Sequence, residues 1–398
     1  MTTTIETSWP LPQEDPSDVL AELRSEAPVH HLPQLGCHIV VAHHEAVTAL
    51  ASPKWSSNPL GASSMLNRGM ADSDLLSHSV LFTDPPEHER LRRSLTGFFS
   101  PRSVGALAPR IAAIADSAFS ELWHAERVDV RRDIAQAIPL AVMCELLDVD
   151  ASMAGVLRTE TPLLTAVLDP LADAEALDQA VTAGTTLMFE VIPLVAGRLN
   201  CPGEDLISAL LHEGSPVALE SDEAVLMSLL LLTAGHETTA SIIGSMVVRL
   251  NADPLLARLL RTTSELRDQA IEELFRLDSP VQLVSRICRE QTELGGIHFD
   301  PGMQILISIP GANRDPGVFE RPDELVLEHR STRHIAFGHG IHFCAGAALA
   351  RAEARVVLDR ILQLDPPIEH RALHCERGHS ITFRRFDRLD LVRLPTGG

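Results

Sequence analysis

The stretch from residue 337 to 349, FGHGIHFCAGAAL, places one cysteine among three glycines and directly ahead of a run of strong helix formers. Glycine accepts a positive φ and lets backbone come close to a bound group, so such a loop can wrap tightly around one sulfur atom. The run that follows, AGAALARAEARVVLDRIL, consists largely of residues that favour helix. Cys344 is therefore expected near the positive end of a helix dipole, where a thiolate is favoured over a thiol.

The residues of this loop leave three other interpretations open. In the first, Cys344 is simply a buried apolar cysteine, which is the usual state of an isolated cysteine. Alternatively, His339, His342 and Cys344 bind zinc, although no fourth ligand is close in sequence and the chain contains no CxxC. The third interpretation is a plain glycine-rich turn.

Composition and charge exclude several function classes. The 398 residues carry a net charge of −21, which argues against nucleic acid or an anionic membrane as the main partner. The six cysteines are scattered without the spacing of a disulfide framework, which fits a reducing cytoplasm. We expect neither a signal peptide nor an anchor, because the start MTTTIETSWP has no basic or apolar run. The longest apolar run, 224–235, is shorter than the roughly 20 residues that span a bilayer.

Hydrophobic periodicity predicts a mainly helical chain with a few strands. No repeat, low-complexity segment or linker-like shift in composition divides residues 1–398, so one domain is expected. A β-rich run is expected at 36–42, a hairpin with a Pro-Gly turn within 295–316, and strand-like segments after 365. Helices are predicted for these segments: 17–27, 43–51, 84–102, 105–126, 133–147, 151–168, 173–199, 221–250 and 264–278.

The segment 221–250 is the clearest helix, and from 224 to 234 it is apolar on nearly all sides. Ser221 is expected to cap its start. The sequence AGHETT (234–239) interrupts this apolar stretch with Glu237, and a buried carboxylate is costly unless it is paired or functional. Ala234 and Thr238 are one turn apart, so the threonine hydroxyl can bond the Ala234 carbonyl. Gly235 leaves room for something small to approach the backbone.

Two further residue pairs are weak signals when taken alone. His88 and Arg92 lie four residues apart on one face of a predicted helix, and they are equally consistent with a solvated basic surface. Glu273 and Arg276 lie three apart, and as a surface pair they would contribute only about 0.2–0.5 kcal/mol.

Taken together, these motifs resemble the cytochrome P-450 superfamily. Phe337, Gly340, Cys344 and Gly346 match its signature Phe-x-x-Gly-x-x-x-Cys-x-Gly, and AGHETT matches its oxygen-activation motif. The His-x-x-x-Arg and Glu-x-x-Arg helices occur in the family's order within roughly 84–360. The resemblance implies a predominantly helical α+β fold with haem between a long central helix and the cysteine loop.

The family resemblance also implies a cofactor and roles for particular residues. Haem b (iron protoporphyrin IX) would take an axial thiolate from Cys344, with Thr238 contacting dioxygen and Glu237 feeding protons towards it. Glu273 and Arg276 would lock a downstream arginine, for which Arg330 is our candidate. The residues implied to contact the cofactor, four of them candidate cations for its propionates, are His88, Arg92, Arg286, His342, Phe337, Gly338, Ala234, Gly235 and Gly346.

The implied function is a haem monooxygenase that hydroxylates or epoxidises a largely apolar small molecule, free or carrier-tethered, in bacterial secondary metabolism. Electrons from NAD(P)H would arrive through a ferredoxin and its reductase, docked on the candidates Arg102, Arg333, Arg351 and Arg355. Oxidative C–C or C–O coupling, peroxide-driven oxidation and haem binding without turnover remain alternatives. Residues expected in the substrate pocket are Val281, Leu283, Val284, Leu231, Leu164 and Phe386.

Overall fold

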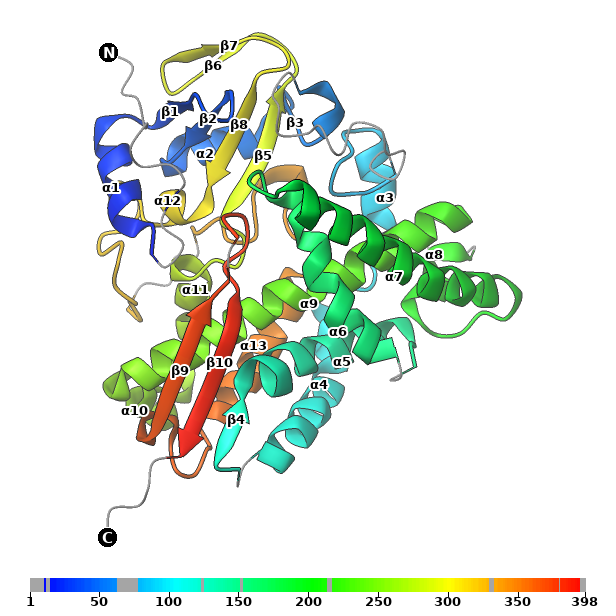
Figure 1. Cartoon of the computed structure of the whole chain (residues 1–398), viewed down its shortest axis with the longest axis vertical. Coiled ribbons are helices and arrows are strands. Elements are labelled where there is room, and N and C mark those ends of the chain that lie inside the picture. The colour runs from blue at the N-terminus through cyan, green and yellow to red at the C-terminus, as the bar shows by residue number, and fades with distance from the viewer. Residues whose placement is uncertain are drawn as a thin grey trace.

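The computed structural model describes residues 11, 15–62, 78–122, 125–150, 153–212, 217–328, 333–378 and 380–393. Figure 1 shows a helix-rich body with a small sheet on one side and a second small sheet near the C-terminus. This arrangement confirms the predicted α+β class with mostly helix. One domain for residues 1–398 stays a prediction.

The helix α9 (Ser221–Ala252) crosses the centre of the helical part (Figure 1). Its 32 residues span about 48 Å at 1.5 Å per residue. The predicted cap was wrong, because Glu220 precedes the helix and its backbone N–H donates to Glu223 at 3.0 Å. The helices that pack against α9 include α5 (Ala137–Leu147), α6 (Met153–Leu164), α7 (Ala174–Asn200) and α13 (Ala347–Ile361).

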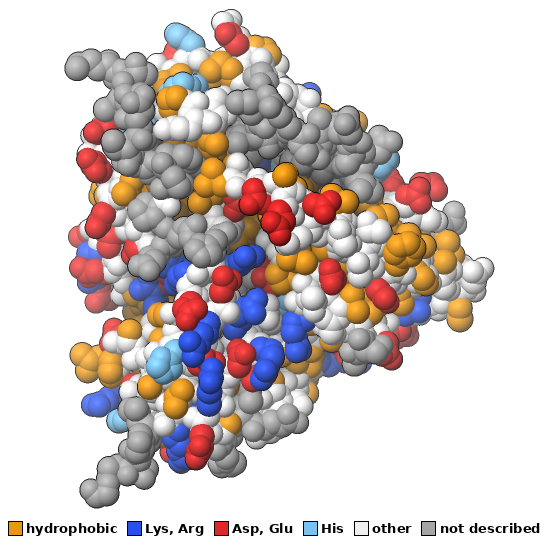
Figure 2. Space-filling view, in the orientation of Figure 1, with side chains coloured by type: hydrophobic (Ala, Val, Ile, Leu, Met, Phe, Trp, Pro, Cys, Tyr) orange, Lys and Arg blue, Asp and Glu red, His pale blue; other side chains and the backbone are white. Residues whose placement is uncertain are grey.

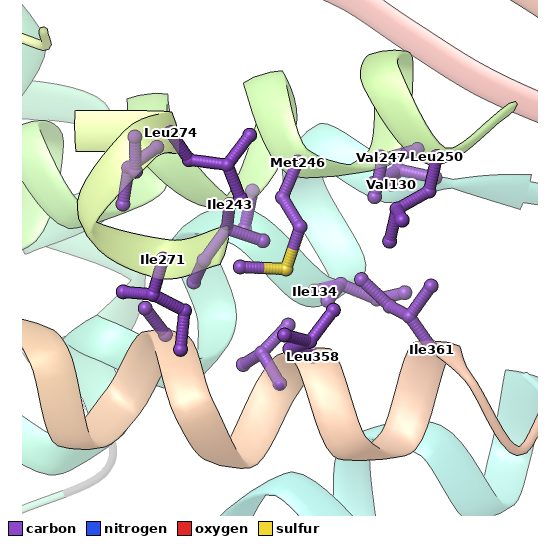
Figure 3. Packing of buried hydrophobic residues seen from close by; sticks show 14 of the residues in the cluster. Val130, Ile134, Ile243, Met246, Val247, Leu250, Ile271, Leu274, Leu358 and Ile361 are labelled. Atoms are coloured by element: carbon purple, nitrogen blue, oxygen red, sulfur yellow. The ribbon is translucent and has the colours of Figure 1, made fainter. Parts of the chain in front are cut away.

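Apolar residues of α9 and α13 interdigitate in the main buried cluster. Figure 3 shows Met246 of α9 above Leu358 of α13. The helix α11 (Arg267–Leu277) adds Ile271 and Leu274 to the same cluster. The helix after Cys344 is thereby fixed to the helix that carries Glu237 and Thr238.

The remaining helices match most of the predicted segments, with boundaries displaced by a few residues. Helix α4 begins four residues earlier than predicted, at a proline whose fixed φ suits a first turn. The bounds are α1 (Ser17–Glu26), α2 (His43–Ala51), α3 (Glu87–Leu95), α4 (Pro101–Leu122), α8 (Leu206–Leu211), α10 (Pro254–Thr262) and α12 (Ile309–Asn313), with a π-helical turn η4 (Arg131–Gln136) before α5.

A five-stranded sheet has the order β1-β2-β8-β5-β3, in which only β2 and β8 run parallel. The predicted Pro-Gly turn is present at Pro301-Gly302, where the Met303 N–H donates to the Asp300 carbonyl at 3.1 Å, but the hairpin forms around a different turn. The tight turn is Gly295-Gly296, both at positive φ, and Pro301 begins the connection to β8 in the larger sheet. The strands are β1 (Val29–Leu32), β2 (Cys37–Val40), β3 (Trp55–Ser56), β5 (Leu283–Cys288), β6 (Thr292–Leu294), β7 (Ile297–Phe299) and β8 (Gln304–Ser308).

The second sheet joins β4 (Arg127–Asp129), β10 (Phe386–Arg393) and β9 (Arg371–Arg377), all antiparallel. Figure 2 shows Lys and Arg side chains gathered over this sheet, although the chain as a whole is strongly acidic. The turn between β9 and β10 reaches back towards the five-stranded sheet (Figure 1), where Phe383 bridges Val281.

Two helices, α7 and α9, are long and apolar enough to cross a membrane by length and composition alone. Most of the apolar window of α9 is buried inside the protein, as expected for a core helix. Only 28% of the corresponding window of α7 is buried, and Phe189 and Val181 are exposed on its outer side. Taken alone, these windows are weak signals of a membrane span.

Candidate functional site

The loop around Cys344 is closed by a hydrogen bond and shaped by two glycines. The Cys344 N–H donates to the Phe337 carbonyl at 2.8 Å. Gly338 and Gly340 both have positive φ, at 74° and 72°. A Cβ on Gly340 would also lie 2.5 Å from the Leu50 carbonyl oxygen, so only glycine fits there.

Cys344 is not in a disulfide and retains accessible surface, while Gly346 precedes the first turn of α13. Without a bound metal, desolvation of the sulfur raises the pKa of the Cys344 thiol, so the expected thiolate depends on more than the helix dipole. The Gly346 N–H and the charges of Arg92 and Arg351 lower this pKa only in part. A metal ion bound to the sulfur would be what deprotonates it.

A set of polar contacts centred on Arg276 supports this loop from beneath, and we call it the support. Its buried guanidinium makes a bidentate pair with Glu273, at 2.8 and 2.7 Å. The same group donates to three backbone carbonyls, those of Asn313, Pro322 and Glu324. Arg330, the predicted third member, lies outside the described residues, so the pair acts on backbone carbonyls in the part of the chain that the structure describes.

Sequence reasoning missed a second glutamate beside the first. Glu272 accepts both guanidinium donors of Arg351, at 2.5 and 2.9 Å, and lies 3.0 Å from His334 Nε2. These hydrogen bonds outweigh burial and lower the pKa of Glu272 to about 2. Arg351 in turn stacks over the Phe337 ring at 4.3 Å. Glu272 thus ties α11 to α13 and to the loop, and only the spacing of Arg351 from Cys344 hinted at this role.

Asn313 is a further support that no motif indicated. Its side-chain oxygen accepts from the Ile335 N–H at 2.7 Å, two residues before Phe337. Its amide donates to Ser279 at 2.9 Å. The side chain is fully buried, so it fixes the start of the cysteine loop against the end of α11.

The structure brings the four predicted propionate contacts together. The rings of His88 and His342 lie 4.1 Å apart, and the charges of Arg92 and Arg286 act on both. Within the described residues, no carboxylate comes within ion-pairing distance of either arginine. Both ring nitrogens of His88 are buried without a hydrogen-bond partner in that same part of the chain. Such a cluster is suited to binding an anionic group.

Four positive charges were expected in this cluster, and that expectation was wrong. Burial, together with Arg286, His88 and Arg92, lowers the pKa of His342 to about 3. Burial likewise lowers the pKa of His88. At neutral pH the two arginines therefore carry the charge, while the neutral histidines offer ring N–H groups as hydrogen-bond donors.

On α9, the Thr238 hydroxyl donates to the Ala234 carbonyl at 2.8 Å, as predicted. Glu237 is buried and accepts from Gln136 Nε2 at 3.3 Å, with His236 Nδ1 3.4 Å away. The sequence motif gave no sign of Gln136, which comes from η4, one hundred residues earlier.

The predicted role of Gly235 was wrong. A Cβ at this position would lie 2.8 Å from Met143 Sδ, so Gly235 faces α5 and allows the two helices to approach closely. The neighbouring Ala234 is the residue with exposed surface on this turn.

The pocket candidates divide into two groups. Leu164, Leu231, Val281 and Val284 are partly buried, as residues beside a pocket would be. Leu283 and Phe386 were wrong, because each is packed in a buried apolar cluster. Phe383, three residues before Phe386, is the hairpin residue that meets Val281.

A groove of about 1440 Å³ lies between α4, α5 and α8, lined by Leu107, Cys144 and His212 among others. None of the catalytic, cofactor or pocket residues predicted from sequence lines it. This groove is therefore separate from the site around Cys344.

The donor set fits a haem rather than a metal held by side chains alone. Among the described residues, no three His, Cys, Asp or Glu side chains gather into a metal site, so the zinc alternative has no ligand set there. A porphyrin needs only one axial ligand from the protein, and Cys344 offers it. Arg92 and Arg286 fit the propionates of such a group.

The comparisons with known proteins agree with this geometry. The Cytochrome P450 family model matches residues 199–364. Cytochrome P450 107B1 of Saccharopolyspora erythraea is 33% identical over 84% of this chain and 83% of its own. Cytochrome P450 monooxygenase PikC of Streptomyces venezuelae is 33% identical over 89% and 85%.

Among solved structures, P450BioI in complex with a hexadecenoic acid-ligated acyl carrier protein superimposes with a TM-score of 0.89. It is 26% identical and covers 96% of this chain and 99% of its own. Sequence identity, coverage and fold agree, and the chain belongs to the cytochrome P450 family of haem-thiolate monooxygenases, which use O2 and reducing equivalents.

Proposed function

We propose that this cytochrome P450 hydroxylates or epoxidises a largely apolar small organic molecule in bacterial secondary metabolism. The observation that carries the proposal is the packing of α9, with its acid and alcohol, against α13, which begins beside the single thiol of Cys344. Bound by Cys344, the haem b iron would activate O2 with electrons that originate in NAD(P)H.

Four residues of the chain have proposed roles beside the haem. Arg92 and Arg286 neutralise the propionates, and their burial away from carboxylates makes that pairing favourable. The Thr238 hydroxyl already donates to Ala234, so its oxygen is free to accept a hydrogen bond on the substrate side. Glu237, buried near it on the same helix, supplies protons.

Ferredoxin and its reductase are the proposed electron donors, and the structure narrows the proposed docking surface. Arg102 and Arg333 are exposed, whereas Arg351 and Arg355 are only partly exposed. Reversing both charges at Arg102 and Arg333 should slow ferredoxin-driven turnover and flatten its salt dependence. Reversal of the exposed Arg132 on η4 is the matched control, and an equal effect there would overturn this docking surface.

The substrate is proposed to be either free or tethered to a carrier protein. The neighbour P450BioI is described with a fatty acid on an acyl carrier protein, which supports the tethered form. We place the protein in the cytoplasm, because its six cysteines are scattered without disulfide-framework spacing and the similar proteins are bacterial cytochromes P450.

Spectroscopy tests the function directly. The purified protein, reduced under carbon monoxide, should show the Soret shift of thiolate ligation, and Cys344→Ala should abolish it. Candidate substrates should shift the resting spectrum as they displace water from the iron. A colourless protein after haem supplementation, or an unchanged Cys344→Ala spectrum, would overturn the proposal.

A further inference from the structure

Side chains from three elements meet at one oxygen of Glu237. Gln136, the last residue of η4, donates its amide to Glu237 Oε1 at 3.3 Å. His236 Nδ1 lies 3.4 Å from the same oxygen. Thr161 of α6 lies 3.0 Å from the same imidazole nitrogen, Nδ1. All four side chains are less than a tenth exposed.

The hydrogen bonds of Thr161 fix the tautomer of His236. The threonine hydroxyl donates to the Leu157 carbonyl at 2.7 Å, so its oxygen must accept from the imidazole. The proton of the neutral ring is therefore on Nδ1, where Thr161 accepts it, and Glu237 Oε1 lies 3.4 Å from the same nitrogen. Burial lowers the pKa of His236 and keeps it neutral. Among the described residues, nothing bonds its Nε2.

A cavity of about 20 Å³ lies beside Glu237, between η4, α9 and β10. That volume admits roughly one water molecule. Its polar lining gives a water several partners: Gln136 and Glu237, with Ser241, Arg131 and Arg385. Arginine side chains gather on the outer surface over this region (Figure 2), and short π-helical turns such as η4 often mark functional sites.

We propose that His236 and Gln136 are positioning residues for Glu237, and that a water in this cavity returns protons to its carboxyl group. The Gln136 N–H donates to Oε1 and the His236 Nδ1–H lies beside it, which leaves Oε2 to take a proton from the water and pass it on. This inference rests on the proposed monooxygenase function. The charged groups that face the pair are Arg131, Arg158 and Arg385.

Two measurements test the arrangement without turnover. In the diamagnetic carbon monoxide complex of ¹⁵N-histidine-labelled protein, His236 should appear as the neutral Nδ1–H tautomer, assigned by its absence in His236→Gln. A crystal structure should show an ordered water within hydrogen-bonding distance of Glu237 in the cavity. An Nε2–H tautomer, or a cavity without water, would overturn the inference.

Gln136→Met tests the positioning role because it keeps the side-chain length and removes the donor. We expect the share of reducing equivalents lost as peroxide to rise by up to roughly tenfold, less than the 10²–10⁴-fold that general acid catalysis can supply. The effect should disappear when Glu237→Gln is already present. If Gln136→Met raised the share of reducing equivalents lost as peroxide equally with Glu237 and with Glu237→Gln, the proposal would be overturned.

Gln304→Met is the matched control. Gln304 is as buried as Gln136 and donates to Ser285 on the five-stranded sheet, so its loss should lower stability without raising peroxide. A similar rise in peroxide formation in both variants would show that the Gln136 effect is general destabilisation, and would overturn its positioning role. If the wild type oxidises no substrate with its redox partners, the proposed function fails, while the tautomer and water results still decide this inference.

Discussion

The support beneath the cysteine loop and the cationic cluster of His88, Arg92, Arg286 and His342 both bury charged or titratable groups, but they treat them differently. In the support, Arg276 satisfies its nitrogens with one carboxylate and three carbonyls. In the cluster, both nitrogens of His88 are without a partner in the described chain. Because an unpaired buried polar group costs free energy, the first region contributes stability and the second is suited to a ligand.

A similar contrast is present on α9, where one polar side chain bonds to its own helix and others bond to side chains from different elements. Thr238 bonds its own helix, as an ordinary buried threonine does. Glu237 and His236 instead depend on side chains from η4 and α6. Residue type alone therefore does not separate residues that stabilise the fold from residues that serve the site. What separates them is whether other groups of the protein satisfy all their hydrogen bonds.

The largest effect should follow from Arg276→Ala. It leaves the partly buried Glu273 without its arginine and releases three carbonyls, so we expect a loss of about 3–5 kcal/mol in the free energy of unfolding. Urea unfolding measures this loss. Arg321→Ala, on the exposed pairs with Glu324 and Glu328, is the control and should change stability by less than about 1 kcal/mol. Equal losses would show that Arg276 has no special supporting role.

Glu272→Gln should make the free energy of unfolding less dependent on pH in the acidic range. The pKa of Glu272 is lowered from 4.5 to about 2 in the folded protein, so its contribution is complete above the unfolded value near 4.5. That contribution is lost as pH falls through about 2, and it corresponds to roughly 2–3 kcal/mol. Unfolding measured between pH 6 and 3 should show wild type and variant converging as the pH falls. Parallel curves would contradict the assignment.

Gly340→Ala should cost about 1–3 kcal/mol, since alanine is strained at φ 72° and its Cβ meets the Leu50 carbonyl. Gly105→Ala in α4 is the control, at ordinary φ with open space around the added Cβ. Thermal unfolding and the fraction of haem retained should separate the two variants. Equal behaviour would mean that the loop relaxes around residue 340.

The smallest effect on stability is expected for His88→Leu. Removing two unpartnered buried nitrogens should leave the free energy of unfolding of haem-free protein unchanged within about 1 kcal/mol, or raise it. Haem should nevertheless transfer faster to a competing haem-binding protein. A large loss of stability with unchanged haem retention would reverse our assignment of the two regions.

The motifs that were correct from the sequence are those whose geometry is local. The turn from Thr238 to Ala234 needs only helical spacing, and the loop from Phe337 to Cys344 needs only eight residues, two of them glycines at positive φ. Contacts between distant segments that no motif of the resemblance connects were missed or misplaced. Gly235 against Met143 and Glu237 with Gln136 each join parts of the chain that no periodicity connects.

By itself, the sequence determined the helical character, the loop around Cys344 and the order of the motifs, because backbone preferences and short spacings act between neighbours along the chain. Only the tertiary structure decided which polar groups are satisfied. Arg276 meets carbonyls about forty residues away, and His88 meets His342 from the other end of the chain. Hydrogen bonding and desolvation depend on what surrounds a group in space, and that is fixed only when distant segments pack together.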